Sequence, residues 1–145
     1  MTLEHRIRRL EDIEEIRAVL IAYGRTLDQR DFEGYSRLFA RDGTWTGGFG
    51  SATGPAAILA MLEQNLGAAG SALPSGSHHL LTNMSIEPDG DKAQAWSRWS
   101  FVVAGADGKP SILFTGQYDD VLTREDGRWR FRSRTVSADF PFVPS

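Results

Sequence analysis

Three Asp-Gly pairs in the second half of this 145-residue chain constrain its fold more than any other feature of its sequence. Such pairs are strong signals for the tight turns of β-hairpins. Because long strands joined by hairpins cannot stay flat, we expect an antiparallel sheet that twists and curls. The pairs are Asp89-Gly90, Asp107-Gly108 and Asp126-Gly127, and they delimit four expected strands, His78–Ile86, Lys92–Ala104, Ser111–Arg124 and Arg128–Asp139.

The N-terminal half has a helical period instead. Apolar residues recur at steps of three and four from Thr2 to Asp28, which predicts one long helix with a buried stripe and a solvated charged face. Asp31 can cap a second helix that ends near Asp42-Gly43, and Gly54-Pro55 begins a third. The first stripe consists of Leu3, Ile7, Leu10, Ile13, Ile16, Leu20, Tyr23 and Leu27; the second buried face consists of Phe32, Tyr35, Leu38 and Phe39.

Helices followed by strands indicate a single α+β domain over residues 1–145. We expect three N-terminal helices packed on a curved, mostly antiparallel sheet, which together form a cone-shaped barrel with an internal pocket. The segment Gly67–Gly76 is rich in glycine, alanine and serine and reads as a loop between the two halves.

Charge and composition exclude several classes of protein. The net charge of −3 argues against a nucleic-acid-binding surface, which would be rich in clustered lysine and arginine. No apolar run approaches the roughly 18 residues of a membrane-spanning helix. The charged segment Met1–Arg9 also lacks the apolar core of a signal peptide, so a cytoplasmic protein is expected.

Metal and cofactor sites are not expected either. The chain has no cysteine, which excludes thiolate ligands, and only three histidines. His78 and His79 are adjacent on a predicted strand, point to opposite faces and are poor joint ligands. Glycine-rich phosphate-binding motifs and the HExxH zinc motif do not occur. We therefore predict chemistry that depends on side chains alone.

Asp28 and His79 are the first candidates for that chemistry. Asp28 lies at the end of the long helix, where the dipole disfavours a carboxylate, although an aspartate there can simply form a turn. A strand histidine can act in acid–base catalysis or serve structure, and the sequence leaves this open. Strict alternation places His79 on one face with Leu81, Asn83 and Ser85.

Tyr23 and several aromatic residues are candidates for contact with a ligand. Tyr23 belongs to the core stripe, and a buried tyrosine hydroxyl usually finds a partner. Gly24 beside it permits either close packing or space for a ligand. The aromatic residues are ordinary core or the lining of a pocket for a flat, apolar ligand; they are Trp45, Trp96, Trp99, Phe101, Phe114 and Tyr118.

Three stretches of the sequence resemble a known family of domains, and the resemblance covers nearly the whole chain. They read LEDIEEIRAVLIAYGRTLDQRDFEGYSRLFARDGTW, HHLLTNMSIEPDGDKAQA and GQYDDVLTREDGRWRFRSR. They resemble SnoaL-like domains of the nuclear-transport-factor-2-like superfamily. The order Y-x4-D, H-x3-N and DG-x-W is similar to the branch that contains scytalone dehydratase, bile-acid 7α-dehydratase and hexachlorocyclohexane dehydrochlorinase.

The resemblance implies a cone of three helices against a curved mixed sheet, with Asp28 and His79 as a catalytic dyad inside it. Tyr23 matches a tyrosine of the bile-acid enzyme. Ser97 stands where scytalone dehydratase has a second histidine, Leu27 stands where it has a tyrosine, and Ala138 or Asp139 falls where the bile-acid enzyme has an arginine. The relatives' substrates are therefore not carried over.

The expected function is that of a cofactor-independent lyase acting on a small, apolar, cyclic or aromatic substrate. His79 is the general base, Asp28 orients it, and Tyr23 hydrogen-bonds the leaving group. The expected substrate contacts are Trp45, Asn83, Ser97, Trp99, Phe114 and Tyr118. Two alternatives stay open: an isomerase or cyclase with the same base, and a non-catalytic domain that binds a small ligand. We expect a homo-oligomer, either a dimer or a trimer.

The tail from Ala138 to Ser145 is too apolar for a free end. Its two prolines cannot continue a sheet or enter a helix. We predict that it folds back over the open end of the cone or onto a second subunit, or that it covers the outer face of the sheet.

Overall fold

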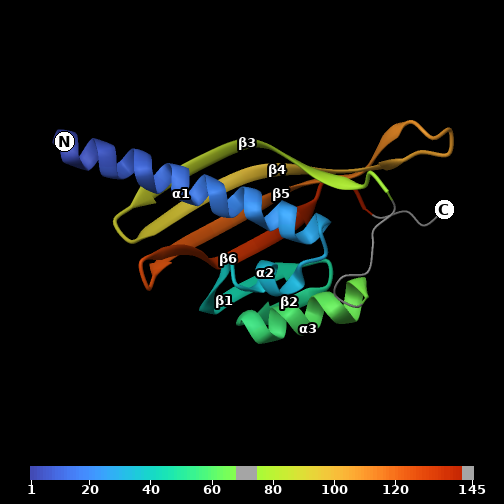
Figure 1. Cartoon of the computed structure of the whole chain (residues 1–145), viewed down its shortest axis with the longest axis horizontal. Helices are drawn as coiled ribbons and strands as arrows, with labels where there is room; N and C mark the ends of the chain where they lie inside the picture. The colour runs from blue at the N-terminus through green and yellow to red at the C-terminus, as the bar shows by residue number, and fades with distance from the viewer. Residues whose placement is uncertain (68–74, 142–145) are drawn as a thin grey trace.

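The structure is a computed structural model, and residues 1–67 and 75–141 are described. Three helices and six strands follow one another along these residues (Figure 1). In chain order they are α1 (Leu3–Asp28), α2 (Phe32–Ser36), β1 (Phe39–Gly47), β2 (Gly50–Thr53), α3 (Pro55–Leu66), β3 (His78–Asp89), β4 (Lys92–Ala104), β5 (Pro110–Glu125) and β6 (Arg128–Ala138).

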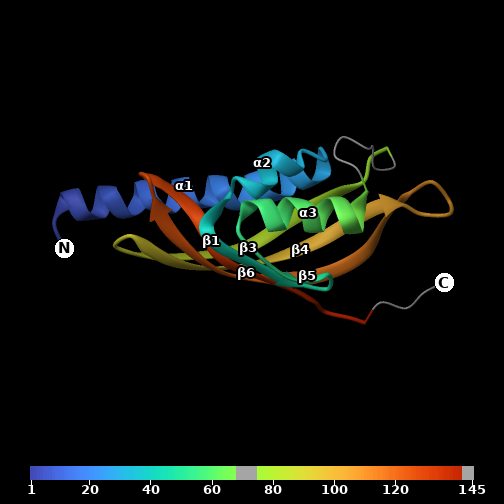
Figure 2. The same ribbon diagram turned by 90° about the horizontal axis from the view of Figure 1, so that it is seen from below.

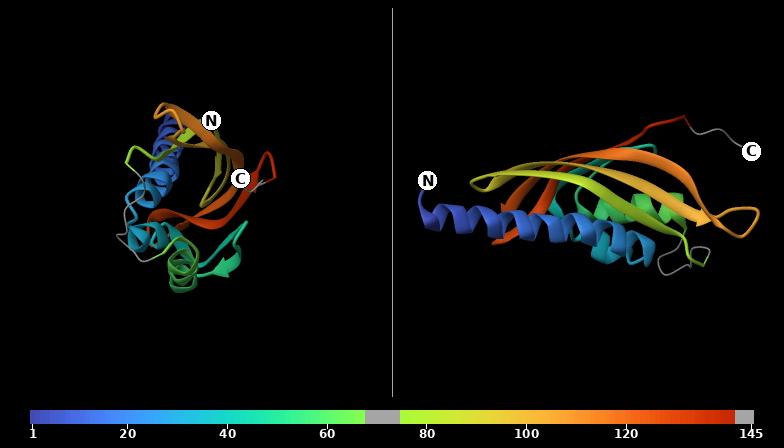
Figure 3. Two further views of the ribbon diagram at one scale, coloured as in Figure 1. Left: turned by 90° about the vertical axis from the view of Figure 1, so that its right-hand side faces the viewer. Right: turned by 90° about the horizontal axis from the view of Figure 1, so that it is seen from above.

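The strands form one sheet in the order β2-β1-β6-β5-β4-β3. Only β1 and β6 are parallel, and the other pairs are antiparallel. The three helices lie on one face of the sheet, which curves around them (Figures 2 and 3). The expected α+β class is confirmed. The cone is open, however, because β2 and β3 are the two edges of the sheet and do not pair with each other.

The Asp-Gly pairs form the predicted hairpins. Glu125 pairs with Arg128 across a two-residue turn in which Asp126 and Gly127 both have positive φ, at 52° and 77°. That is the backbone of a type I′ turn, whose twist matches the flanking strands. The other two turns differ in type. Gly90, with positive φ, and Asp91 connect β3 to β4 directly after Asp89, and Gly108, also with positive φ, lies in a longer loop between Ala104 of β4 and Pro110 of β5.

The second helix ends earlier than the sequence indicates, and a strand replaces its last part. α2 is a single turn, and Phe39 already belongs to β1, where it lies beside Phe131 of β6. A Cβ at Gly43 would approach the Phe131 carbonyl oxygen to 2.5 Å. Gly43 therefore permits an irregular, close pairing of two strands and does not mark the end of a helix.

The predicted stripe of α1 is buried over only part of its length. Ile16, Leu20 and Tyr23 are in the core, whereas Leu3, Ile7 and Leu10 are 67%, 47% and 63% exposed. The first turn of α1 extends beyond the strands in two views (Figures 1 and 2), and at the following turns Arg9 and Asp12, not Leu10, contact β3 and β5.

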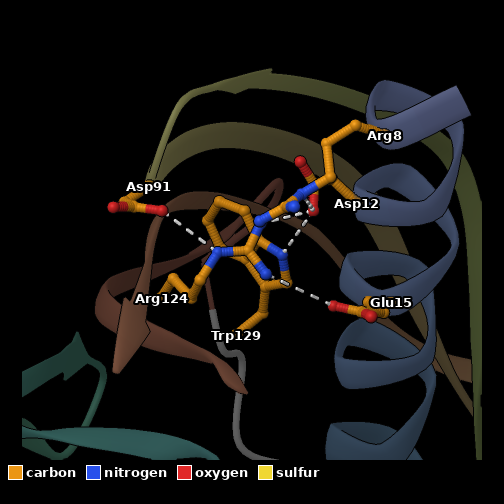
Figure 4. A network of polar contacts seen from close by, with 6 residues as sticks. All are labelled: Arg8, Asp12, Glu15, Asp91, Arg124 and Trp129. Atoms are coloured by element: carbon orange, nitrogen blue, oxygen red, sulfur yellow. Dashed lines mark hydrogen bonds and ion pairs between the residues drawn. The ribbon is translucent and has the colours of Figure 1, made fainter. Parts of the chain in front are cut away.

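A polar cluster on α1 corrects the expectation that all its charges face solvent (Figure 4). Asp12 is only 6% exposed, and its Oδ1 accepts hydrogen bonds from Arg124 Nη2 at 2.5 Å and Trp129 Nε1 at 3.2 Å. Arg124 also donates to Asp91 and lies over the Trp129 ring. We refer to Asp12, Asp91, Arg124 and Trp129 as the Asp12 clamp, which fixes α1 to β5, β6 and the β3–β4 turn.

Candidate active site

The opposite end of α1 brings together Asp28 and His79. Asp28 is the last residue of α1, and His79 is the second residue of β3, the strand that runs beside that helix. Asp28 Oδ1 lies 2.5 Å from His79 Nδ1, and Asp28 Oδ2 accepts the backbone N–H of His79 at 3.0 Å. Two hydrogen bonds from one residue thus fix the carboxylate against the imidazole.

This geometry determines which ring nitrogen is free. An ionised carboxylate can only accept hydrogen bonds, so Nδ1 of His79 carries the proton that is donated to Asp28. Nε2 then holds the lone pair of the neutral ring. The ring of Phe101, directly across the sheet on β4, lies 4.7 Å from the imidazole and restricts its rotation.

Two cavities meet at His79. The outer cavity, of about 310 Å³, runs along the end of α1 past Ile21, Gly24 and Arg25. The inner cavity, of about 280 Å³, lies under the sheet and is lined mainly by apolar side chains, among them Leu62, Leu66 and Phe114. Four residues line both cavities and form what we call the shared wall: Tyr23, His79, Trp99 and Tyr118.

The hydroxyl of Tyr23 already has two partners. It accepts hydrogen bonds from the Tyr35 hydroxyl at 2.6 Å and from Trp45 Nε1 at 2.9 Å. Burial raises the pKa of Tyr23, so its phenol stays neutral near neutral pH. Trp45 and Tyr35 thereby fix the orientation of the Tyr23 ring.

A fully buried ion pair lies behind the shared wall. Arg134 of β6 donates from Nε and Nη2 to the two carboxylate oxygens of Asp120 at 2.7 and 2.8 Å. Its guanidinium is 3.8 Å from the centre of the Tyr118 ring and 4.1 Å from that of Tyr23. Burial opposes the charge of Arg134, but the attraction of Asp120 outweighs it and raises the pKa of the guanidinium. A permanent positive charge therefore lies against both tyrosines.

Comparison with known proteins agrees with this architecture. The sequence profile of the SnoaL-like domain matches residues 8–135, which is most of the chain. The chain belongs to the SnoaL-like domain family. No curated protein has a significantly similar sequence.

Solved structures place this SnoaL-like domain among proteins with the same fold. It is 29% identical to an NTF2-like protein with a cystatin-like fold from Novosphingobium aromaticivorans, with a TM-score of 0.80 over 94% of this chain and 88% of that one. It is 28% identical to a function-unknown protein from Mycobacterium tuberculosis, with a TM-score of 0.75 over 91% and 74%. It is 20% identical to LinA, with a TM-score of 0.77 over 96% and 98%, a likeness that concerns the fold alone.

The remaining expected site residues of the SnoaL-like domain divide into two groups. Trp99 and Tyr118 belong to the shared wall, and Trp45 and Phe114 line the inner cavity. Ser97 is fully buried and Asn83 is exposed, and neither lines these two cavities.

A β-bulge explains the position of Asn83. The pairing of β3 with β4 shifts between Thr82 and Ser85, and Asn83 has a φ of 55°. One extra residue reverses the alternation, so Met84 and Ile86 follow Leu81 into the core. The expectation that Asn83 and Ser85 share a face with His79 is therefore wrong.

The structure also separates the two neighbouring histidines. His78 is exposed, and its Nδ1 lies 2.8 Å from the carbonyl oxygen of Gly76. Within residues 1–67 and 75–141 no group of three histidine, aspartate or glutamate side chains has the arrangement of a metal site. In the same residues no helix is long and apolar enough to cross a membrane.

Sequence reasoning missed Asp120 and Arg134. A sequence signal for a buried charge was present in β5. Asp120 occupies the same alternating, inward-facing set of positions as Tyr118 and Leu122. Each charge alone looks like a solvated edge residue. Only the register of β5 against β6, which pairs Asp120 with Arg134, reveals the ion pair.

Proposed function

We propose that this SnoaL-like domain is a cofactor-independent lyase that eliminates water, an acid or another small fragment from a flat, apolar substrate. The observation that carries the proposal is the hydrogen bond of 2.5 Å between Asp28 and His79 at the boundary of two cavities. Family membership supports elimination chemistry, because the SnoaL-like family includes dehydratases and dehydrochlorinases.

In the proposed reaction, Nε2 of His79 removes a proton from a substrate carbon. The imidazolium that results is stabilised by the Asp28 carboxylate, as in the aspartate–histidine pair of serine proteases. The electron pair of the broken C–H bond forms a double bond, and the leaving group departs with its own pair. Proton transfer of this kind contributes about 10²- to 10⁴-fold in rate.

The two cavities fit different parts of such a substrate. The inner cavity offers an apolar space for a ring, which suits binding without charged contacts. The outer cavity is lined in part by Arg25, Asp28 and Gln29 and provides a more polar passage along α1. His79 lies between them, where a proton at the edge of a bound ring comes within reach of Nε2.

The proposal is tested with 5-nitrobenzisoxazole, a flat compound that undergoes elimination when a base removes its single heteroring proton. We expect the purified protein to accelerate this elimination and His79→Ala to lower kcat/KM by about 10²-fold or more. His78→Ala is the matched control, because this neighbouring ring is exposed and lines neither cavity. Equal rates for the wild-type protein and His79→Ala would contradict the proposed base.

A second measurement separates the lyase from its alternatives. If the protein is a lyase, the product formed from a natural substrate has a lower mass than the substrate, because a fragment has been eliminated. An isomerase or cyclase leaves the mass unchanged, and a binding domain yields no product. Circular dichroism and thermal unfolding of each variant verify that the fold is retained.

A further inference from the structure

Tyr118 is the second residue of the shared wall that carries a hydroxyl group, besides Tyr23. It lies in the middle of β5, is only 4% exposed and lines both cavities. Its ring stacks on Trp99 at 6.0 Å and meets the edge of Tyr23 at 5.3 Å. The ring is therefore fixed on two sides within the wall that contains His79.

The hydroxyl of Tyr118 has no partner in the described part of the chain. Tyr23, by contrast, accepts hydrogen bonds from both Tyr35 and Trp45. The enclosed polar atoms that lack a partner belong to other residues, Trp99 and Arg134 among them, and the Tyr118 oxygen is not one of them. A hydroxyl that has neither a partner nor a complete covering of protein atoms is open to the cavities that its residue lines.

The charge behind Tyr118 suits a group that gives up a proton. The Arg134 guanidinium lies 3.8 Å from the ring centre and is held there by Asp120. Burial raises the pKa of Tyr118 well above its usual value, while the positive charge of Arg134 acts in the opposite direction. The phenol is thus protonated at neutral pH, and Arg134 stabilises the phenolate formed when the proton leaves.

We propose that Tyr118 donates the proton to the leaving group in the elimination, a role that the sequence suggested for Tyr23. This assignment rests on the proposed function. His79 Nε2 takes the carbon-bound proton, and the C–H electron pair becomes the double bond. The bond to the leaving oxygen breaks with its electron pair on oxygen, which takes the Tyr118 proton and departs as water or an alcohol. The imidazolium then returns its proton to the phenolate through the released molecule, which restores both residues.

Two benzisoxazoles test the role of Tyr118, because they share the proton that is removed but differ in the leaving oxygen. In both, a base takes the heteroring proton, the N–O bond breaks and the oxygen leaves as a phenolate. The nitro group of 5-nitrobenzisoxazole stabilises that phenolate, and unsubstituted benzisoxazole lacks this help. We expect Tyr118→Phe to lower kcat/KM about 10- to 100-fold for unsubstituted benzisoxazole and no more than about threefold for the nitro compound.

Phenylalanine keeps the ring over Arg134 and against Trp99, so only the hydroxyl is lost. His79→Ala is the contrasting variant, because removal of the base lowers both rates by similar factors. Equal losses for the two compounds in Tyr118→Phe indicate a structural role and overturn the inference, and so does an unchanged pair of rates. Tyr23→Phe is expected to leave the ratio of the two rates as in the wild-type protein, and a changed ratio there would assign the donor to Tyr23.

Binding of β-naphthol and naphthalene tests the same hydroxyl without any chemistry. The two rings have nearly the same shape, but only β-naphthol presents an oxygen. We expect Tyr118→Phe to weaken β-naphthol binding about tenfold and to leave naphthalene binding unchanged. An equal effect on both ligands would overturn the inference.

Turnover of the benzisoxazoles and binding of the naphthalene ligands together distinguish a failure of the Tyr118 assignment from a failure of the proposed function. A wild-type protein that accelerates neither benzisoxazole contradicts the lyase, while the naphthol pair still decides whether Tyr118 donates to an oxygen in the cavity. If His79→Ala lowers the rates for both compounds but Tyr118→Phe changes neither the rates nor the binding of β-naphthol, His79 is the base and Tyr118 is not the proton donor.

Discussion

The two halves of α1 each present an aspartate to the sheet, and the two aspartates have different surroundings. Asp12 is buried and accepts hydrogen bonds from Arg124 and Trp129. Asp28 lies at a cavity, with 21% of its side chain exposed, and accepts both of its hydrogen bonds from His79.

The difference lies in what the partner can do. The hydrogen bond that Arg124 donates to Asp12 raises the pKa of the Arg124 guanidinium, so that partner keeps its charge at every ordinary pH. Histidine is a side chain suited to acid–base catalysis, and Nε2 of His79 forms no hydrogen bond with the residues that the structure describes. The same carboxylate on the same helix thus supports structure at one end and, in our proposal, proton transfer at the other.

The largest effect that would sharpen this comparison is expected for Asp28→Asn. Asparagine keeps the size of the side chain but cannot stabilise an imidazolium, so turnover of 5-nitrobenzisoxazole is expected to fall about 10²- to 10⁴-fold. The midpoint of thermal unfolding should change little, because the residue is partly exposed. A variant that turns over like the wild-type protein would show that Asp28 only terminates the helix.

Asp12→Asn is expected to give the opposite result. It leaves Arg124 without its closest carboxylate, and the free energy of unfolding should fall by about 1.5–3 kcal/mol, as for hydrogen bonds to charged groups. Urea unfolding measures this loss, and turnover at a temperature where the variant is folded should match the wild-type protein. A large loss of turnover without a loss of stability would break the division of roles between the two aspartates.

Gly24→Ala is expected to have smaller effects on both stability and substrate turnover. A Cβ at this position meets nothing closer than the His79 Cβ at 4.0 Å, which is ordinary contact. Alanine is favoured over glycine within a helix by about 1 kcal/mol, so the variant should be more stable by up to that amount. Because Gly24 lines the outer cavity, we also expect a higher KM. Greater stability with an unchanged KM would mean that substrates do not pass this point.

The smallest effect is expected for Glu87→Ala, which removes the ion pair with Arg9 between β3 and α1. The two side chains are 69% and 38% exposed, and pairs of this kind contribute about 0–1 kcal/mol. Differential scanning calorimetry should find a shift well below that of Asp12→Asn. A comparable shift in the two variants would mean that burial does not distinguish the Asp12 clamp from surface pairs.

The structure tests only part of the prediction that the C-terminal tail folds back over the cone, onto a second subunit or over the outer face of the sheet. Asp139 is fixed to Thr115 by a hydrogen bond of 2.9 Å and forms an ion pair with Arg98. Phe140, which follows it, is 74% exposed and covers neither cavity. Phe142, Val143 and the rest of the predicted lid lie outside the described residues.

Local chemistry made much of the fold predictable. Asp126-Gly127 requires positive φ at two successive residues, and that demand is met within the turn itself. The Ile16–Leu20–Tyr23 part of the helical stripe is likewise a local pattern, and it is buried as predicted. The pairing of Asp28 with His79 was accessible only through a resemblance, because the two residues are far apart in the chain and neither is distinctive alone.

What the sequence by itself determined was the set of features that a few neighbouring residues can specify: the long helix, the three hairpins and the residue types that can transfer a proton. The tertiary structure alone decided whether a side chain is covered, because burial depends on segments that are distant in sequence. It left Leu3 and Leu10 exposed while Asp12 of the same helix is buried, and it turned Asn83 outward at a bulge. It also buried Asp120 against Arg134, since the register of β5 on β6 brings two opposite charges to hydrogen-bonding distance in the core, behind the tyrosines of the shared wall.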